Sequence, residues 1–216
     1  MFLMMKMLRY KIIPVTLLQQ NSTLIWCEKT QLGAVIDPGG DIDKINTIIK
    51  QHHIHVEKIL LTHGHLDHVG GAKTLAEEYN IPILGPHEND KFLFDMLAQQ
   101  AMMFGFPPLE PFYPTQFLTE RDIIHIGDEK IHILFIPGHT PGHIVFINYC
   151  NNLGFVGDTL FKGSIGRTDF PLSSHQQLIA AIKNKLLTLN EDLIFIPGHG
   201  DISCIKEEKK YNTFLQ

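Results

Sequence analysis

The sequence predicts an α/β domain in which two β-sheets carry helices on their outer faces. Two observations predict it: short apolar runs rich in Ile and Val have the length and composition of strands, and helical patterns fall between several of them. The strands dominate the first part of the chain and the helices are interleaved later, which favours sheets covered by helices. Because no linker or internal repeat divides the sequence, we expect one domain over residues 1–216, with residues 1–7 as a disordered or non-native start.

The individual elements follow from the same patterns. Strands are expected at residues 11–18, 23–27, 34–36, 59–61, 81–84, 131–136, 144–147, 153–156 and 193–196. Helices are expected at residues 41–51, 71–79, 89–104 and 174–187. Asp41 and Ser174 are residue types that cap helix N-termini, whereas Gly85, Gly105 and the Pro107-Pro108 pair end regular structure.

Composition excludes several classes of function. The chain of 216 residues is 44% hydrophobic and carries a formal net charge of -5, so a nucleic-acid partner has no electrostatic support. No apolar stretch is long enough for a membrane span, and Lys6, Arg9 and Lys11 interrupt the apolar start before a signal peptide could form. The three cysteines are far apart and fit a reducing compartment. We expect a cytoplasmic enzyme for a small molecule, as a monomer or small homo-oligomer.

Residues 60–71 carry the strongest chemical signal. An apolar run is followed at once by the pattern His-x-His-x-Asp-His, and three later loops each place one His or Asp after an apolar run and a Gly. Strand ends that converge on one sheet edge bring such side chains together, while Gly and Pro let the backbone turn away. The candidate metal ligands are His63, His65, Asp67, His68, His139, Asp158 and His199.

These seven side chains are too many for one tetrahedral ion, because a catalytic zinc takes three protein ligands and leaves one position for water. Two divalent ions that share a carboxylate fit the count. His and Asp ligands favour zinc, with iron or manganese as alternatives. The other histidines lack such a motif, and His143, in Pro141-Gly142-His143, is expected to be structural or to support a ligand.

The segments T-H-G-H-L-D-H-V-G-G, P-G-H-T-P-G-H, G-D-T-L-F and P-G-H-G, in this order, resemble the metallo-β-lactamase superfamily. More narrowly, the chain resembles YcbL-type glyoxalase II, the short bacterial hydroxyacylglutathione hydrolases. The resemblance implies an αββα sandwich of two mixed sheets, with metals at the sheet edges. The long form of the family carries a C-terminal helical domain that grips glutathione, but only 17 residues follow His199 here, so we expect that domain to be absent.

Carried onto this sequence, the resemblance implies two ligand sets. The first set comprises His63, His65 and His139, the second comprises Asp67, His68 and His199, and Asp158 bridges the two ions. Asp37 matches a family position near the site, where it either orients a ligand or forms a turn.

The implied reaction is hydrolysis of a glutathione thioester, as in methylglyoxal detoxification. A hydroxide bound to both ions would attack S-D-lactoylglutathione and yield D-lactate and glutathione. Asp67 and Asp158, which bind the ions, are the expected catalytic residues. The segment Gly166-Arg167-Thr168-Asp169-Phe170 places Arg167 where a basic residue would contact the substrate, and an Arg167 to Asp169 link is the competing interpretation.

Other functions on this fold stay open. An iron-dependent persulfide dioxygenase of the same superfamily would need only His63, His139 and Asp158. A nuclease would be expected to show a basic exosite, and a binding module would not need the full ligand set. β-Lactam hydrolysis is disfavoured because Asp158 stands where many lactamases place Cys.

Overall fold

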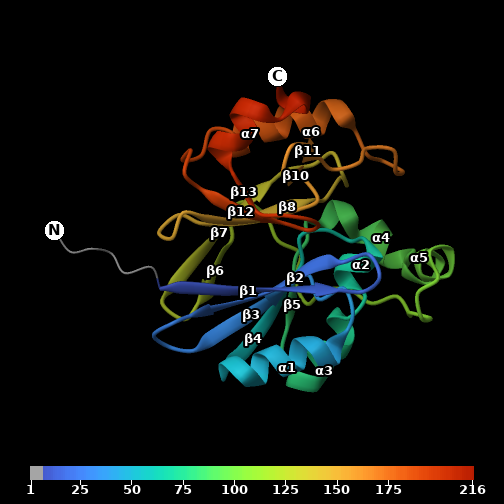
Figure 1. The fold of residues 1–216 in the computed structure, drawn as a ribbon. Helices are drawn as coiled ribbons and strands as arrows, with labels where there is room; N and C mark the ends of the chain where they lie inside the picture. The colour runs from blue at the N-terminus through green and yellow to red at the C-terminus, as the bar shows by residue number, and fades with distance from the viewer. Residues whose placement is uncertain (1–6) are drawn as a thin grey trace.

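Two β-sheets lie face to face in the computed structural model, which describes residues 7–216 (Figure 1). The first sheet has the strand order β1-β2-β3-β4-β5 and the second has the order β13-β12-β9-β8-β7-β6. The first contains β1 (Leu8–Val15), β2 (Gln20–Cys27), β3 (Leu32–Ile36), β4 (His55–Leu60) and β5 (Ile83–Leu84). The second contains β6 (Ile123–Ile126), β7 (Glu129–Phe135), β8 (Ile144–Asn148), β9 (Leu153–Gly157), β12 (Ile194–Pro197) and β13 (Ser203–Cys204). A small hairpin is formed by β10 (Leu160–Phe161) and β11 (Ser164–Ile165).

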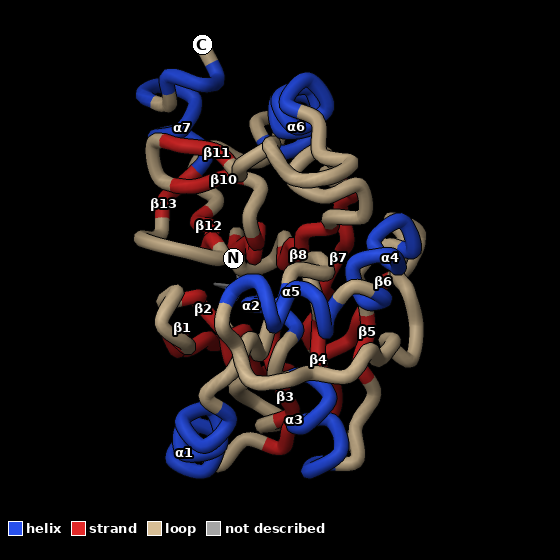
Figure 2. Tube along the Cα trace, turned by 90° about the vertical axis from the view of Figure 1, so that its right-hand side faces the viewer, coloured by secondary structure: helices blue, strands red, loops and turns tan. Residues whose placement is uncertain are grey.

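Helices cover the outer faces of both sheets (Figure 1). On the first sheet lie α1 (Ile42–His52) and α3 (Ala72–Tyr79), and on the second lie α6 (His175–Ala181), its π-helical continuation η2 (Ile182–Leu186), and α7 (Ile205–Tyr211). The remaining helical elements are α2 (Leu66–Val69), η1 (Glu88–Asp90), α4 (Lys91–Asp95), α5 (Leu97–Phe104) and η3 (Thr213–Leu215). Figure 2 shows α2, α4 and α5 together on one side of the molecule, across the ends of the sheets. The predicted arrangement of two mixed sheets between helices is confirmed.

Three apolar layers hold these elements together. Between the first sheet and α1 and α3, Ile45, Ile49 and Leu75 are buried, as the apolar spacing of α1 predicts. Between the two sheets, Phe146 and Phe155 meet residues of β2 to β4. A third cluster joins β8 and β9 to α6 and α7. Both faces of the inner strands are therefore dry, which explains their nearly continuous apolar sequences.

Three details of the predicted elements are wrong. Asp41 makes no capping hydrogen bond, because its side chain accepts from the Thr16 N–H at 2.9 Å, whereas Ser174 does accept from the Gln177 N–H at 3.3 Å. The helix expected at residues 89–104 is divided at Met96, whose φ of -95° and ψ of 5° end α4 and begin α5. The predicted strand at residues 11–18 begins and ends earlier, because the chain turns at residues 16–19.

Some elements could not be predicted from the pattern of apolar residues alone. Strand β6 and the two-residue strands β10, β11 and β13 were not expected, since each is too short or too polar to form a distinct apolar run. The expectation for residues 1–7 lies outside the described residues except at Met7, whose carbonyl accepts from the Glu28 N–H at 2.7 Å. In the part of the chain that the structure describes, no helix is long and apolar enough to cross a bilayer.

Candidate metal centre

The candidate ligands come from loops that follow strands of both sheets. His63 and His65 follow β4, and Asp67 and His68 lie on α2, which begins directly afterwards. The other three, His139, Asp158 and His199, follow β7, β9 and β12. Because these loops meet at the same end of the two facing sheets, side chains separated by up to 136 residues come into contact.

Three histidines form the first group. Nε2 of His63 lies 3.1 Å from Nδ1 of His65, and Nε2 of His139 lies 3.0 Å from the same Nδ1. His63 is fully buried and His139 is 3% exposed. Three imidazole nitrogens that converge in this way can hold one divalent ion.

The second group combines a carboxylate with two histidines. Oδ2 of Asp67 lies 3.1 Å from Nε2 of His199 and 3.8 Å from Nε2 of His68. These three atoms are close enough together to hold a second ion. Both groups are thus formed by the side chains that the sequence motif singled out.

Asp158 lies between the two groups. Its Oδ1 is 3.4 Å from Nε2 of His68, and its Oδ2 is 3.7 Å from Nε2 of His139 and 3.8 Å from Nε2 of His199. Within residues 7–216, neither Asp158 Oδ1 nor His68 Nε2 has a hydrogen-bond partner, although both atoms are buried. Buried polar atoms without partners are costly unless an ion satisfies them, so these residues fit a metal centre.

The backbone makes room for this arrangement at Gly198. A Cβ on Gly198 would lie 2.1 Å from Asp158 Oδ1 and 2.6 Å from Cε1 of His68. Any larger residue would displace both side chains. Close packing against Asp158 and His68 therefore explains why the residue before His199 is a Gly.

Four histidines have their second ring nitrogen fixed by a neighbour. Nδ1–H of His68 donates to Asp37 Oδ2 at 2.9 Å, and that of His63 to Thr62 Oγ1 at 3.0 Å. In the same way, His139 donates to the Arg167 carbonyl at 2.8 Å and His199 to the Leu18 carbonyl at 3.2 Å. Each bond orients its ring so that Nε2 faces the site, as in metal-binding histidines.

Asp37 is held in a position to orient His68. Its Oδ1 accepts from the Thr62 N–H at 2.8 Å and its Oδ2 accepts from Thr62 Oγ1 at 2.6 Å. Asp37, His63 and His68 also converge closely enough to hold an ion. Because the carboxylate oxygens of Asp37 already accept three hydrogen bonds, the orienting role fits better than ligation. The turn is also present, since Asp37 has a φ of 47°.

The electrostatics divide the histidines into two kinds. Burial lowers the pKa of His65 to about 3, with a further contribution from His139, and burial holds the pKa of His63 well below its usual range. Burial would also lower the pKa of His68, but Asp158 and Asp67 outweigh it and hold that pKa well above the usual value. In the metal-free protein, the first group is therefore neutral and ready for an ion, whereas His68 carries a proton.

The two carboxylates stay ionised in this environment. Burial would raise the pKa of Asp158, but the neighbouring His68, His139 and His199 hold it far below its usual range. The pKa of Asp67 is lowered in the same way by His68 and His199, against the effect of burial.

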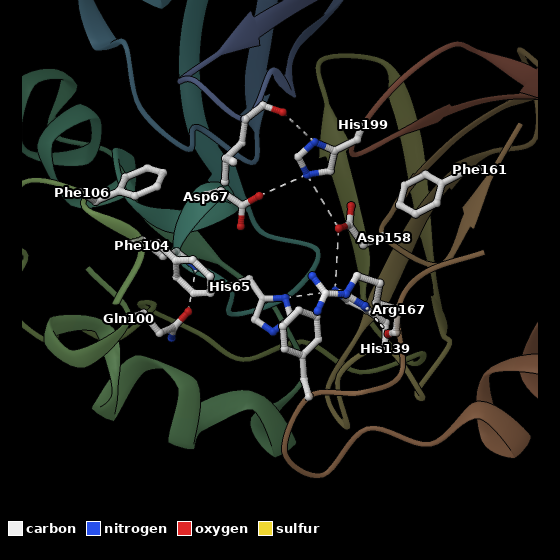
Figure 3. A pocket seen from close by; sticks show the side chains of 13 residues that line it. His65, Asp67, Gln100, Phe104, Phe106, His139, Asp158, Phe161, Arg167 and His199 are labelled. Atoms are coloured by element: carbon white, nitrogen blue, oxygen red, sulfur yellow. Dashed lines mark hydrogen bonds and ion pairs between the residues drawn. The ribbon is translucent and has the colours of Figure 1, made fainter. Parts of the chain in front are cut away.

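A pocket of about 380 Å³ opens over the two groups (Figure 3). In Figure 3, the imidazole of His199 and the carboxylates of Asp67 and Asp158 point toward its interior. The pocket is lined by Leu18, His65, Leu66, Asp67, Gln100, Phe104, Phe106, His139, Asp158, Phe161, Arg167, Phe170 and His199. The walls away from the polar groups are thus mainly aromatic.

Arg167 reaches the pocket but is already paired. Its Nε and one terminal nitrogen donate to the two carboxylate oxygens of Asp169 at 3.0 and 2.8 Å. The guanidinium also lies 4.6 Å from the centre of the Phe170 ring. Both charged side chains are exposed, at 68% and 65%, so the Arg167 to Asp169 link is weak and open to competition by an anion.

Sequence reasoning missed several supporting side chains. Thr62 was not singled out, although its position directly before the motif could have indicated a support for His63. His143, expected to be structural or supporting, accepts from the Asp158 N–H through Nε2 at 3.1 Å and stacks on His63 at 4.6 Å. The aromatic walls of the pocket come from α5, from β10 and from the loops beside them.

The profile of the Metallo-beta-lactamase superfamily matches residues 15–199. The chain therefore belongs to the metallo-β-lactamase superfamily, and it is an enzyme of the metal-dependent hydrolase type. The resemblance inferred from the motifs is confirmed at this level.

Three relatives show how far the similarity extends. The chain is 46% identical over 206 residues to the hydroxyacylglutathione hydrolase GloC of Haemophilus influenzae, covering 95% of this chain and 97% of that protein. It is 31% identical to the BLEG-1 B3 metallo-β-lactamase, with a TM-score of 0.88 over 96% of this chain and 99% of that one. It is 31% identical to TTHA1623, solved in a di-iron-bound form, with a TM-score of 0.85 over 95% of this chain and all of the other.

Proposed function

We propose that this chain hydrolyses the thioester bond of a hydroxyacylglutathione, with S-D-lactoylglutathione as the first candidate. The observation that carries the proposal is the pair of ligand groups with Asp158 between them, beneath an open pocket. The similarity to a protein named as a hydroxyacylglutathione hydrolase supports the choice of substrate. The partner of the enzyme is then a small-molecule glutathione thioester.

In this proposal each ligand group holds one divalent ion. His63, His65 and His139 hold the first, Asp67, His68 and His199 hold the second, and Asp158 serves both. Zinc suits these nitrogen and oxygen ligands, and iron and manganese are alternatives. When bound, such a pair of ions acidifies a water molecule and polarises a carbonyl group.

The reaction breaks the C–S bond of the thioester and forms a C–O bond with water. Its products are a 2-hydroxy acid and the glutathione thiol. Asp67 and Asp158 remain ionised at neutral pH, so both carboxylates can bind cations. Asp67 is the more open of the two, with 18% of its side chain exposed against 13%, and we assign to its carboxylate the transfer of a proton from the attacking water to the departing thiolate, which leaves as the thiol.

The thiol carrier would lie along the aromatic side of the pocket. Phe104, Phe106, Phe161 and Phe170 provide apolar walls beside the polar centre. Arg167 is the single Lys or Arg among the described lining residues, so it is the side chain that would attract a glutathione carboxylate.

An assay of the zinc-loaded chain with S-D-lactoylglutathione tests the proposal. Released thiol and D-lactate are measured together, since hydrolysis gives both in equal amounts. The Asp158→Asn variant is the control, because it keeps the shape of the side chain but removes the charge between the two groups. Equal release that depends on Asp158 is expected. Absence of thiol release from the metal-loaded protein would refute the proposal.

The alternative is an iron-dependent persulfide dioxygenase. It would use His63, His139 and Asp158, and it would leave Asp67, His68 and His199 without a role. The complete second group therefore favours the hydrolase. Oxygen uptake by the iron-loaded chain with glutathione persulfide, in the absence of thioester hydrolysis, would reverse the choice.

A further inference from the structure

Asp90 is a buried carboxylate outside both ligand groups. It ends η1, directly before α4, and its side chain is inaccessible to solvent. Its Oδ2 accepts from the Gly64 N–H at 3.0 Å and from Thr140 Oγ1 at 2.8 Å, and its Oδ1 accepts from the Gly142 N–H at 2.5 Å. No Lys, Arg or His in residues 7–216 forms an ion pair with it, so neutral donors alone hold this charge. Such a costly arrangement requires a reason.

The three donors lie in the loops that carry the first ligand group. Gly64 is the residue between His63 and His65, and Thr140 directly follows His139. The loop of Gly64 follows β4 of the first sheet, and the loop of Thr140 and Gly142 lies between β7 and β8 of the second. Asp90 therefore ties the two sheets together at the point where the first group is assembled.

Neighbours of Asp90 strengthen the same contact. The His87 N–H donates to the Gly142 carbonyl at 3.1 Å, and Asn89 Nδ2 donates to the Pro141 carbonyl at 3.3 Å. A Cβ on Gly142 would lie 2.5 Å from the Asp90 nitrogen and 2.6 Å from its Cγ. The backbone thus approaches Asp90 as closely as it does because residue 142 is Gly.

The second ligand group has different supports. His68 is oriented by Asp37 and His199 by the Leu18 carbonyl. None of the hydrogen bonds described for Asp90 reaches these residues or Asp67. A change at Asp90 should therefore affect the two groups unequally.

We infer that Asp90 is a positioning residue that fixes His63, His65 and His139 relative to one another for the first metal ion. This inference rests on the metal centre proposed above. Loss of an outer hydrogen-bond partner of a metal ligand weakens metal affinity by roughly 10- to 100-fold. Asp90 acts one step further out, through the backbone on either side of the ligands, and joins loops of two sheets.

The test compares Asp90→Asn with Glu208→Gln. Glu208 is also buried and also accepts from three neutral donors, Gly163 N–H, Ser203 Oγ and Asn212 Nδ2, but it lies on α7 away from the ligand groups. The zinc affinity of each binding step is measured by chelator competition at pH 8, since burial raises the pKa of Asp90 to about 7. In His65→Ala the first group loses a ligand, so the binding step that this variant loses is the one that belongs to the first group.

We expect Asp90→Asn to weaken the step lost in His65→Ala by about tenfold or more. Glu208→Gln should leave both steps unchanged, even if its melting temperature falls as far as that of Asp90→Asn. Wild-type affinity in both steps of Asp90→Asn, or equal weakening of both steps, would overturn the inference. No substrate enters this measurement, so its outcome is independent of whether the chain cleaves glutathione thioesters.

A second pair of variants covers the case in which Asp90→Asn does not fold. Thr140→Val removes one of the three donors at nearly constant shape, and Thr140→Ser retains the hydroxyl. Thr140→Val should weaken the same binding step by a smaller factor, and Thr140→Ser should bind zinc like the wild type. If Thr140→Val binds both ions with wild-type affinity, Asp90 does not position the first group through this contact.

Discussion

Asp37 Oδ2 and His68 Nδ1 lie 2.9 Å apart, with both side chains at most 3% exposed. The same carboxylate accepts from the N–H and the hydroxyl of Thr62, so Asp37 links β3 to the start of the His-x-His segment. The ring of His68 is thereby fixed with Nε2 facing Asp158. This contact explains why residue 37, which directly follows β3 and has a φ of 47°, is an Asp.

Asp37→Asn should weaken metal binding by the second group about 10- to 100-fold. The amide of Asn places an NH₂ donor where the carboxylate accepts from Thr62 or His68, so one of these bonds is lost. Chelator competition measures the affinity. Asp41→Asn is the control, because Asp41 also accepts from a backbone N–H, that of Thr16, but makes no contact with a ligand. Equal affinities in the two variants would contradict the orienting role.

Asp158→Ala should abolish hydrolysis and loosen both ions, because Asp158 lies within 4 Å of nitrogens from both groups. His143→Ala should keep nearly the full metal content, since its Nε2 contacts the backbone N–H of Asp158 and not the carboxylate. Elemental analysis of both proteins, purified without chelator, gives the answer. Comparable metal loss in the two variants would show that the ligand assignment is wrong.

Arg167→Ala should raise KM for S-D-lactoylglutathione without changing metal content. Since an exposed ion pair contributes up to about 1 kcal/mol, the expected rise is about fivefold. Arg167→Lys should recover part of it, because a point charge cannot reproduce the bidentate fork.

Asp169→Ala is the informative partner of this variant, since it frees the guanidinium from its present carboxylate. If Arg167 binds substrate, Asp169→Ala should keep or lower KM. If Arg167 serves only the link to Asp169, both variants should lower the melting temperature equally and leave KM unchanged.

Binding of an ion by the second ligand group should release protons at neutral pH. The pKa values of His68 and His199 are raised despite burial, by Asp158 and Asp67 for His68 and mainly by Asp67 for His199, so both rings hold a proton more tightly than a free imidazole does, and an ion bound by this group must displace it. The rings of the first group are neutral and have no proton to lose. Calorimetric titration in buffers of different ionisation enthalpy measures the release. Proton release that accompanies ion binding only at the first ligand group would contradict the assignment of charges.

In the metal-free protein the same shifts affect stability. A raised pKa of His68 means that the folded state binds its proton more tightly than the unfolded state. The stabilisation from His68 is therefore complete below about pH 6.5 and is lost as pH rises through the folded-state pKa. The lowered pKa of His63 acts in the opposite sense and destabilises the metal-free fold as pH falls below about 6.5.

The sequence was most informative where chemistry is concentrated in short motifs. Residues 63–68 and the three Pro-Gly or Gly-Asp loops predict which side chains meet, because each follows an apolar strand. The apolar runs likewise predict the inner strands, since both of their faces are buried. The layered fold follows from these two patterns.

Other features depend on contacts between distant segments and have no local signal. Asp90 resembles any polar residue at a helix start, and only the folded chain brings it to Gly64 and Thr140. The break at Met96 falls inside a sequence that favours a helix throughout. Asp41 resembles a helix N-cap because it directly precedes a helical pattern. Its actual partner, the Thr16 N–H, is 25 residues away in the sequence and could not be predicted locally.

The measurement that tests the central claim most directly is a titration of the metal-free chain with zinc while S-D-lactoylglutathione hydrolysis is followed. Two ligand groups that share Asp158 predict that activity rises until about two equivalents per chain are bound, and that D-lactate and free thiol appear in equal amounts. Activity that saturates at one equivalent, or absence of hydrolysis at two, would contradict a two-metal thioester hydrolase.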